Sequence, residues 1–159
     1  HGSSSSSSDG YVNAGDASWT NYTVEGTLRF PSGAFGGGIA GRVDPASGSH
    51  YGAWIYPDGS DGGPNTLKLC KLRGWTTWNG VPMQQVSLPS VGTGPHRLKL
   101  EFNGNRIKVY YDGTLKIDVT DSNFDSRAAY LQGAVGVGLW TYSTPFTMEV
   151  DDVAVRTLN

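Results

Sequence analysis

Residues 106–119 read RIKVYYDGTLKIDV, and this stretch decides the fold class. Apolar and polar residues alternate on both sides of Asp112-Gly113, which is the period of a β-strand with one buried face. Asp-Gly between two alternating runs favours a two-residue turn, because both turn positions need a positive φ. The stretch therefore predicts a β-hairpin with strands at 106–111 and 114–119.

The same alternation continues in both directions along the chain. Strands are predicted at 22–30, 36–43, 50–56, 66–73, 84–88, 97–102, 133–140 and 147–155, separated by turns rich in Gly, Pro, Asn and Asp. Only the segment 121–130 could hold a short helix or a 3₁₀ turn. Many short strands with little helix between them predict an all-β protein, either a sandwich or a barrel. Of the two, we expect a two-sheet antiparallel sandwich.

One parity of these strands is apolar and would fill the space between two sheets. The expected core residues are Leu98, Leu100, Phe102, Ile107, Val109, Ile117, Val119, Val135, Val137 and Leu139. The other parity is polar and would face outward.

The composition is that of a single domain with a neutral polar surface. With 159 residues the chain can bury a full core by itself. Its net charge of −2 and its charged fraction of 16% argue against a general affinity for nucleic acid or anionic membranes. No apolar run approaches the ~18 residues that span a bilayer, so membrane insertion is not expected. Neutral polar surfaces with few charges are common outside the cell, and we expect a secreted, extracellular protein.

The beginning of the chain has a different composition. A run of serines at positions 3–8 is typical of a flexible linker. Residues 1–9 are therefore predicted to form a flexible Ser-rich segment, and residues 10–159 the folded domain.

Several segments resemble the strands of laminin-G-like, concanavalin A-like jelly rolls. Residues 19–26 (WTNYTVEG) resemble the W-x-D/N-Y-x-V-E strand, 109–113 (VYYDG) match the V-Y-x-D-G hairpin, and 150–153 (VDDV) are similar to the closing I-D-D-V strand. Residues 37–43 and 50–54 are similar to the two strands that follow the first of these segments. Residues 96–100 (HRLKL) resemble W-H-x-L-K-L, with Pro95 in place of the Trp. The resemblance implies a jelly-roll sandwich in a group that includes carbohydrate-binding modules, adhesion domains and modules attached to glycosidases.

One departure from this group concerns the first strand. Relatives usually have an opening strand ahead of the segment that matches residues 10–22, where this chain has the serine run. That strand is either missing or supplied by another part of the chain or by another molecule. An unpaired strand position exposes backbone N–H and C=O groups and favours pairing with a second chain. Self-association into an extracellular structural filament is therefore one alternative function.

The candidate ligand-binding residues are aromatic side chains in loops and near strand ends. Sugar rings present an apolar C–H face that packs on aromatic rings, whereas their hydroxyls need polar partners. The candidates are Trp75, Trp78, Trp54, Trp140 and Tyr142, with Arg42 as a polar partner. The alternative is that these rings fill the core and its rims. The leading hypothesis is a non-catalytic module that binds glycan or another cell-surface ligand.

Two pairs of aspartates are candidate calcium ligands. The resemblance places Asp151 and Asp152 at the structural calcium position of many jelly-roll modules. Asp58 and Asp61 lie in a glycine-rich loop that allows tight backbone turns. Calcium needs several oxygen ligands gathered together. The alternative is that these residues are solvated turn formers.

A glycoside hydrolase of the same fold is the second alternative function. Hydrolysis needs two carboxyl groups facing each other across a cleft. The glutamates are Glu25, Glu101 and Glu149, and the E-x-D-x-x-E pattern of laminarinase-type jelly rolls is absent. Glu25 and Glu101 could share an outer face, but each has Arg or Lys nearby, which favours surface salt bridges.

Cys70 is the only cysteine and lies within a predicted strand. The sequence favours a small buried hydrophobe at this position, with an intermolecular disulfide as the alternative.

Overall fold

The computed structural model describes residues 8–31, 35–141 and 146–158. Their strands are β1 (Ser8–Ala14), β2 (Tyr22–Arg29), β3 (Gly36–Val43), β4 (His50–Tyr56), β5 (Thr66–Leu72), β6 (Gln84–Ser87), β7 (His96–Asn103), β8 (Arg106–Tyr111), β9 (Thr114–Thr120), β10 (Ala134–Thr141) and β11 (Glu149–Thr157). A 3₁₀ turn, η1 (Phe124–Ser126), lies within the only segment for which helix was considered.

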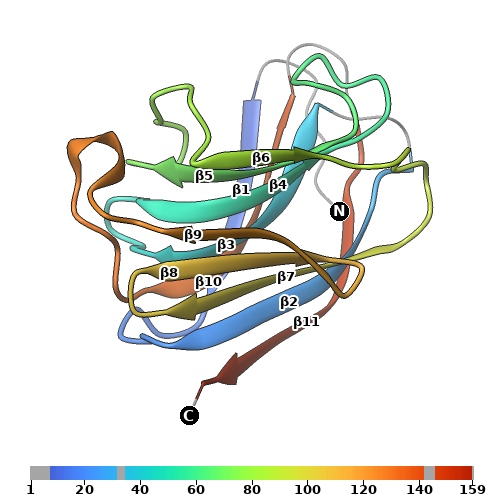
Figure 1. The fold of residues 1–159 in the computed structure, drawn as a ribbon. Helices are drawn as coiled ribbons and strands as arrows, with labels where there is room; N and C mark the ends of the chain where they lie inside the picture. The colour runs from blue at the N-terminus through green and yellow to red at the C-terminus, as the bar shows by residue number, and fades with distance from the viewer. Residues whose placement is uncertain (1–7, 32–34, 142–145, 159) are drawn as a thin grey trace.

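The strands form two antiparallel sheets packed face to face (Figure 1). The six-stranded sheet has the order β1-β10-β3-β4-β5-β6, and the five-stranded sheet has the order β11-β2-β7-β8-β9. The predicted two-sheet jelly-roll sandwich is confirmed. Within the described residues, no helix has the length and apolar character needed to cross a membrane.

The hairpin that decided the fold class forms as predicted. β8 and β9 pair around Asp112 and Gly113, whose φ angles are 48° and 78°. These values suit Asp-Gly, because aspartate tolerates a left-handed backbone better than most residues and glycine has no Cβ. The local turn chemistry and the alternating pattern therefore specify the same structure.

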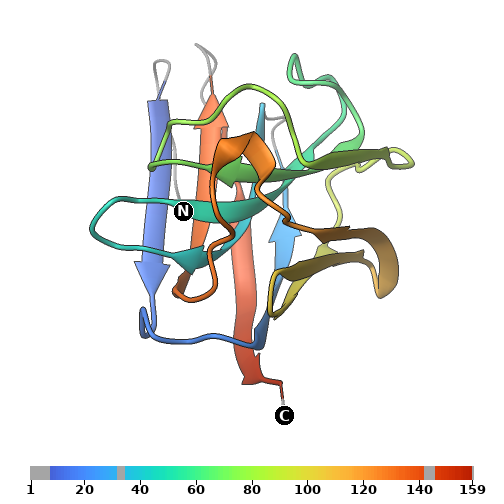
Figure 2. The ribbon, with the colours of Figure 1, turned by 60° about the vertical axis from the view of Figure 1, so that its left-hand side comes forward.

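β1 is the strand that the alternating pattern did not predict. It pairs with β10 from Ser8 to Ala14 and forms one edge of its sheet, as Figure 2 shows for the blue strand beside the orange one. The chain itself thus supplies a strand ahead of residue 22. β1 begins before residue 10, where the folded domain was expected to start; residues 1–7 of the predicted flexible segment lie outside the described residues. Self-association through this edge stays a prediction.

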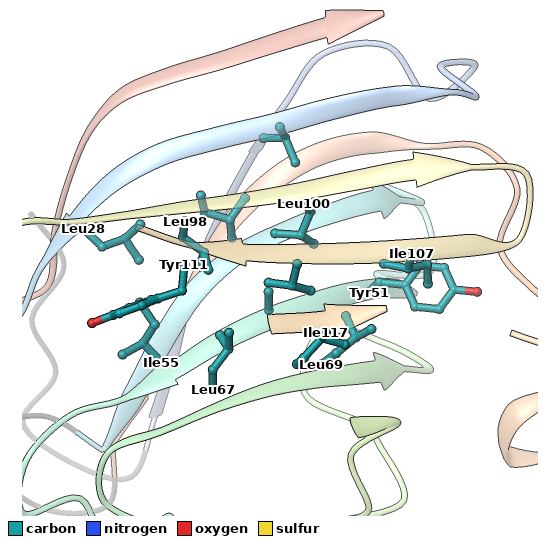
Figure 3. Close-up of a cluster of buried hydrophobic side chains, with 14 of the residues drawn as sticks. Leu28, Tyr51, Ile55, Leu67, Leu69, Leu98, Leu100, Ile107, Tyr111 and Ile117 are labelled. Atoms are coloured by element: carbon teal, nitrogen blue, oxygen red, sulfur yellow. The ribbon is translucent and has the colours of Figure 1, made fainter. Parts of the chain in front are cut away.

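The core lies between the two sheets (Figure 3). Eight of the ten expected core residues are buried, and Val119 and Val137 pack against them while partly exposed. β3 and β4 are buried along their whole length, on both faces. The outward face of the six-stranded sheet must therefore also be covered.

Candidate functional site

The outward face of the six-stranded sheet carries a row of glycines flanked by aromatic residues. In the strand register, Tyr11 on β1 faces Gly138 on β10, Gly138 faces Gly38 on β3, and Gly38 faces Trp54 on β4. Alternate residues of a strand point to the same side, and paired residues share that side. Tyr11 and Trp54 therefore stand on one face with two residues between them that have no side chain.

Glycine allows these rings to lie close to the sheet. A Cβ added at Gly138 would lie 2.5 Å from the ring of Tyr11, and one added at Gly52 would lie 2.8 Å from Nε1 of Trp54. Real Cβ atoms do not approach other atoms so closely. A larger residue at either position would therefore force the ring away from the sheet.

The rings on this face form a series in which each ring lies next to the following one in space. The ring of Tyr11 lies 6.5 Å from that of Trp54, and Trp54 lies 6.4 Å from Tyr56, centroid to centroid. Tyr56 lies 5.7 Å from Phe35, and Phe35 meets Trp140 edge to face at 4.2 Å. Five rings, from β1, β4, β10 and the end of the loop before β3, thus form one unbroken chain.

β1 closes this chain of rings. Trp140 on β10 pairs with Asp9 on β1, and Asp9 stands on the same face as Tyr11, two residues before it. The chain of rings therefore begins and ends beside the N-terminal strand. In Figure 2, β1 and β10 run side by side although they come from opposite ends of the sequence.

These residues surround a cavity of about 320 Å³, here named the aromatic pocket. Its lining residues are Asp9, Tyr11, Phe35, Trp54, Tyr56, Cys70, Leu72, Thr76, Trp78 and Trp140. A concave site lined by apolar and aromatic groups, with few polar ones, is typical of a small-molecule binding site in proteins.

The loop between β5 and β6 forms one wall of the pocket with Thr76 and Trp78. Trp75 of the same loop has a different position. Its ring lies 5.5 Å from Tyr11 and 6.2 Å from His50, and it covers Gly48. Trp75 therefore supports the aromatic pocket from behind Tyr11 without lining it.

Lys68 holds Tyr56 in place. Its Nζ lies 4.3 Å from the centre of the Tyr56 ring and donates a hydrogen bond to the carbonyl oxygen of Gly62 at 2.5 Å. This contact is a cation–π interaction. It joins the loop between β4 and β5 to the rim of the pocket.

Among the described lining residues, Asp9 alone carries a formal charge at neutral pH. Burial raises the pKa of the Cys70 thiol to about 12 and raises the pKa values of Tyr11 and Tyr56, so these groups stay protonated. Partial burial also raises the pKa of Asp9, because the charged carboxylate loses some of its water. The part of the lining that the structure describes contains no Lys, Arg or His.

The position of Cys70 leads to a test of the pocket floor. Because the thiol is 5% exposed and its pKa is about 12, we expect almost no reaction of the native protein with a thiol reagent such as DTNB at about pH 8. The thiol should react fully once guanidinium unfolds the chain. Fast labelling of the native protein, in amounts equal to the protein, would contradict the described packing.

Arg42, predicted to bind ligand, lies away from the aromatic pocket. It is 1% exposed, and its guanidinium donates hydrogen bonds to the carbonyl oxygens of Gly104, Tyr130 and Thr20 at 2.6, 2.6 and 3.0 Å. Burial lowers the pKa of this group. In this position Arg42 joins β3 to three connecting segments, which is a structural role.

The aspartates predicted to bind calcium do not come together. Asp151 and Asp152 lie at a bulge of β11, where the Asp152 backbone N–H donates to Asp151 Oδ1. The Asp58 carboxylate accepts hydrogen bonds from Ser90 Oγ and the Gly92 N–H, and Asp61 is exposed. Among the described residues, no three His, Cys, Asp or Glu side chains are grouped as a metal ion requires. Calcium binding at these aspartates therefore stays a prediction.

Glu25 and Glu101 lie on the five-stranded sheet, away from the aromatic pocket. Glu25 forms ion pairs with Arg97 and Arg156, and Glu101 forms one with Lys108 at 3.0 Å. The arginines beside Glu25 hold its pKa below the ordinary value. Both carboxylates thus belong to a salt-bridged outer face, as the neighbouring basic residues indicated.

Three of the residues predicted to bind ligand line the pocket, namely Trp54, Trp78 and Trp140. Tyr142 lies outside the described residues. The sequence interpretation did not select Asp9, Tyr11, Phe35, Tyr56, Leu72 or Thr76. The alternation of Asp9, Tyr11 and Asn13 was the available signal for β1, but its other parity holds only Gly10, Val12 and Ala14, which is a weak apolar face.

Comparison with known proteins identifies the fold. No family model and no curated protein matches this chain. Among solved structures, the carbohydrate-binding module CBM66 from Bacillus subtilis matches with a TM-score of 0.74 at 21% identity, over 98% of this chain and 86% of that one. The Ca2+/Man-bound exoplasmic/lumenal domain of VIP36 matches with a TM-score of 0.67 at 10% identity, over 96% of this chain and 75% of that one. The catalytic domain of an endo-1,3-beta-glucanase (laminarinase) from Thermotoga petrophila matches with a TM-score of 0.59 at 14% identity, over 93% of this chain and 66% of that one. These likenesses establish the concanavalin A-like jelly-roll fold.

Proposed function

We propose that this chain is a non-catalytic extracellular module that binds carbohydrate in the aromatic pocket. The chain of rings from Tyr11 to Trp140 around a cavity supports this function most directly. The apolar C–H face of a sugar packs on such rings, and the polar groups of the lining can bond its hydroxyls.

The structural neighbours support the same class of ligand by analogy. One is described as a carbohydrate-binding module and another as bound to Ca2+ and Man. Fold likeness by itself does not transfer function, so the aromatic pocket is the main support for carbohydrate binding. Another cell-surface ligand of similar chemistry would also fit this proposal.

A hydrolase is less well supported by the pocket. Glycoside hydrolysis by the common mechanism uses two carboxyl groups on either side of the scissile bond. The lining residues include one carboxylate, that of Asp9. The binding function is therefore favoured over the laminarinase-like one.

The test is retention on gels that contain plant, algal or bacterial polysaccharides, followed by titration with the best ligand. Replacing Trp78 or Trp140 by Ala should weaken binding about tenfold, because each removes a ring face worth roughly 1 kcal/mol or more. Tyr110→Ala is the matched control, since Tyr110 is a partly exposed ring on β8 of the other sheet.

Two results would contradict the proposal. Retention by none of the polysaccharides would remove carbohydrate as the ligand. Equal binding by the Trp78, Trp140 and Tyr110 variants would show that the aromatic pocket is not the site.

A further inference from the structure

The polar groups that line the aromatic pocket are neutral except for one carboxylate. Thr76 offers a hydroxyl, the tyrosines offer phenols, the tryptophans offer indole N–H groups, and Cys70 offers a neutral thiol. Asp9 adds one carboxylate. Among the lining residues that the structure describes, no side chain is cationic and could pair with an anionic ligand.

The carboxylate of Asp9 lies beside the rings. Asp9 is the register partner of Trp140 and stands on the same face of β1 as Tyr11. Its charge contributes to the raised pKa of Tyr11, after the larger effect of burial, which shows that the two groups are close. The single negative charge of the pocket thus stands at the point where the chain of rings closes.

Aromatic ring faces carry partial negative charge and attract cations. One ring of the rim already shows this preference, because the ammonium of Lys68 lies 4.3 Å from the centre of Tyr56. Lys68 also donates to the Gly62 carbonyl and does not line the cavity. Tyr11, Trp54 and Trp140 line the cavity together with Asp9, so their rings and the carboxylate border the same space.

We infer that the aromatic pocket selects its ligand by charge, that it prefers a sugar unit bearing an ammonium group to its neutral counterpart, and that Asp9 is the selecting residue. This inference rests on the proposed carbohydrate-binding function for the identity of the ligand. An ammonium gains from both the ring faces and the carboxylate. A uronic or sulfated sugar meets like charge at Asp9 and finds no cationic side chain among the described lining residues.

A pair of small probes tests the charge preference without a known glycan. Choline and 3,3-dimethylbutan-1-ol have the same shape and differ by the positive charge. We expect choline to bind about tenfold more tightly in an NMR titration, since the aromatic rings and the Asp9 carboxylate attract its positive charge and not the neutral alcohol. Asp9→Asn should weaken choline severalfold and leave the neutral alcohol unchanged. Asp118→Asn on β9 of the other sheet is the control, because it removes the same charge elsewhere.

A matched pair of sugars tests the same preference on the proposed ligand class. Glucosamine oligomers and N-acetylglucosamine oligomers share one backbone, and only the first carry ammonium groups. The wild-type protein should favour the first, and Asp9→Asn should reduce that preference while Asp118→Asn keeps it.

The failure of this inference differs from the failure of the proposed function. Equal or undetectable binding of choline and its neutral analogue, or equal effects of Asp9→Asn and Asp118→Asn, would overturn charge selection even where polysaccharides are retained. Charge selection by Asp9 without retention of any polysaccharide would instead support the inference about the pocket and contradict carbohydrate as the ligand.

Discussion

Replacing Lys71 by Met is expected to lower the free energy of unfolding by about 3–5 kcal/mol, because it leaves the Asp121 carboxylate buried without its cation. Lys71 Nζ lies 2.7 Å from Asp121 Oδ2, and the two side chains are 1% and 0% exposed. The methionine keeps most of the apolar length of lysine. The loss therefore reports the missing charge rather than a cavity.

This buried ion pair connects the sheet to the segment 121–130. Asp121 also accepts hydrogen bonds from the Tyr51 hydroxyl at 2.6 Å and from the Phe124 N–H at 2.8 Å. Lys71 donates to the carbonyl oxygens of Phe124, Arg127 and Ala128. Both carboxylate oxygens and the ammonium thus have hydrogen-bond partners beside the ion pair itself, and such partners help a buried pair to be tolerated.

Equilibrium unfolding in urea at about pH 7 measures this effect under conditions in which Asp121 is charged. Burial raises the pKa of Asp121, but the hydrogen bonds from Lys71, Tyr51 and Phe124 together outweigh it, and the pKa lies below the ordinary value. The stabilisation is therefore present above that ordinary value and is lost as the pH falls through the lowered pKa. Asp118→Asn breaks the exposed pair with Arg106 and should cost at most about 1 kcal/mol. A similar small loss in Lys71→Met would contradict the described burial.

Much of the fold could be predicted because local and global signals agree. The alternation in residues 106–119 and the turn at Asp112-Gly113 specify both a hairpin and a buried face, and the structure has both. β1 could not be predicted in this way. It is an edge strand in which Gly10, Val12 and Ala14 do not form a strong apolar row. Backbone pairing with β10 therefore decides its conformation.

The site was predictable only in part, because the type of residue at one position does not determine the strand register or the path of a loop. Trp75 and Trp78 looked equivalent in the sequence, yet only Trp78 lines the pocket. Arg42 looked like a surface partner for a ligand, but its guanidinium donates its hydrogen bonds to backbone carbonyl oxygens of the protein itself. Tyr11 reaches the pocket through the pairing of β1 with β10, which joins the two ends of the chain.

The wild-type protein should lose about 3 kcal/mol of stability relative to a His50→Phe variant as the pH falls from about 6.5 to about 4. His50 is fully buried, and its Nδ1 lies 2.7 Å from the carbonyl oxygen of Gly48. A carbonyl can only accept, so Nδ1 carries the proton and Nε2 is a bare acceptor. Nε2 has no hydrogen-bond partner among the described residues.

Protonation of this ring would place a cation in a buried site beside the rings of Tyr11 and Trp75, at centroid distances of 5.6 and 6.2 Å. Burial therefore lowers the pKa of His50 to about 4, although the Gly48 carbonyl acts in the opposite direction. The unfolded chain binds a proton below about pH 6.5 and the folded chain does not until about pH 4, so stability falls with pH within this window and levels off below it.

Urea unfolding of both proteins at several pH values between 4 and 8, roughly spanning this window, checks the prediction. Subtracting the profile of His50→Phe removes the contributions of the carboxylates and of the other histidines, since both proteins share them. The difference should be constant above about pH 6.5 and should change by about 1.4 kcal/mol for each pH unit within the window. Parallel profiles would show that His50 titrates alike in both states and would contradict its burial behind Tyr11. Because Tyr11 also lines the aromatic pocket, a confirmed profile would mean that this rim of the site packs against a neutral imidazole at the pH of the binding experiments.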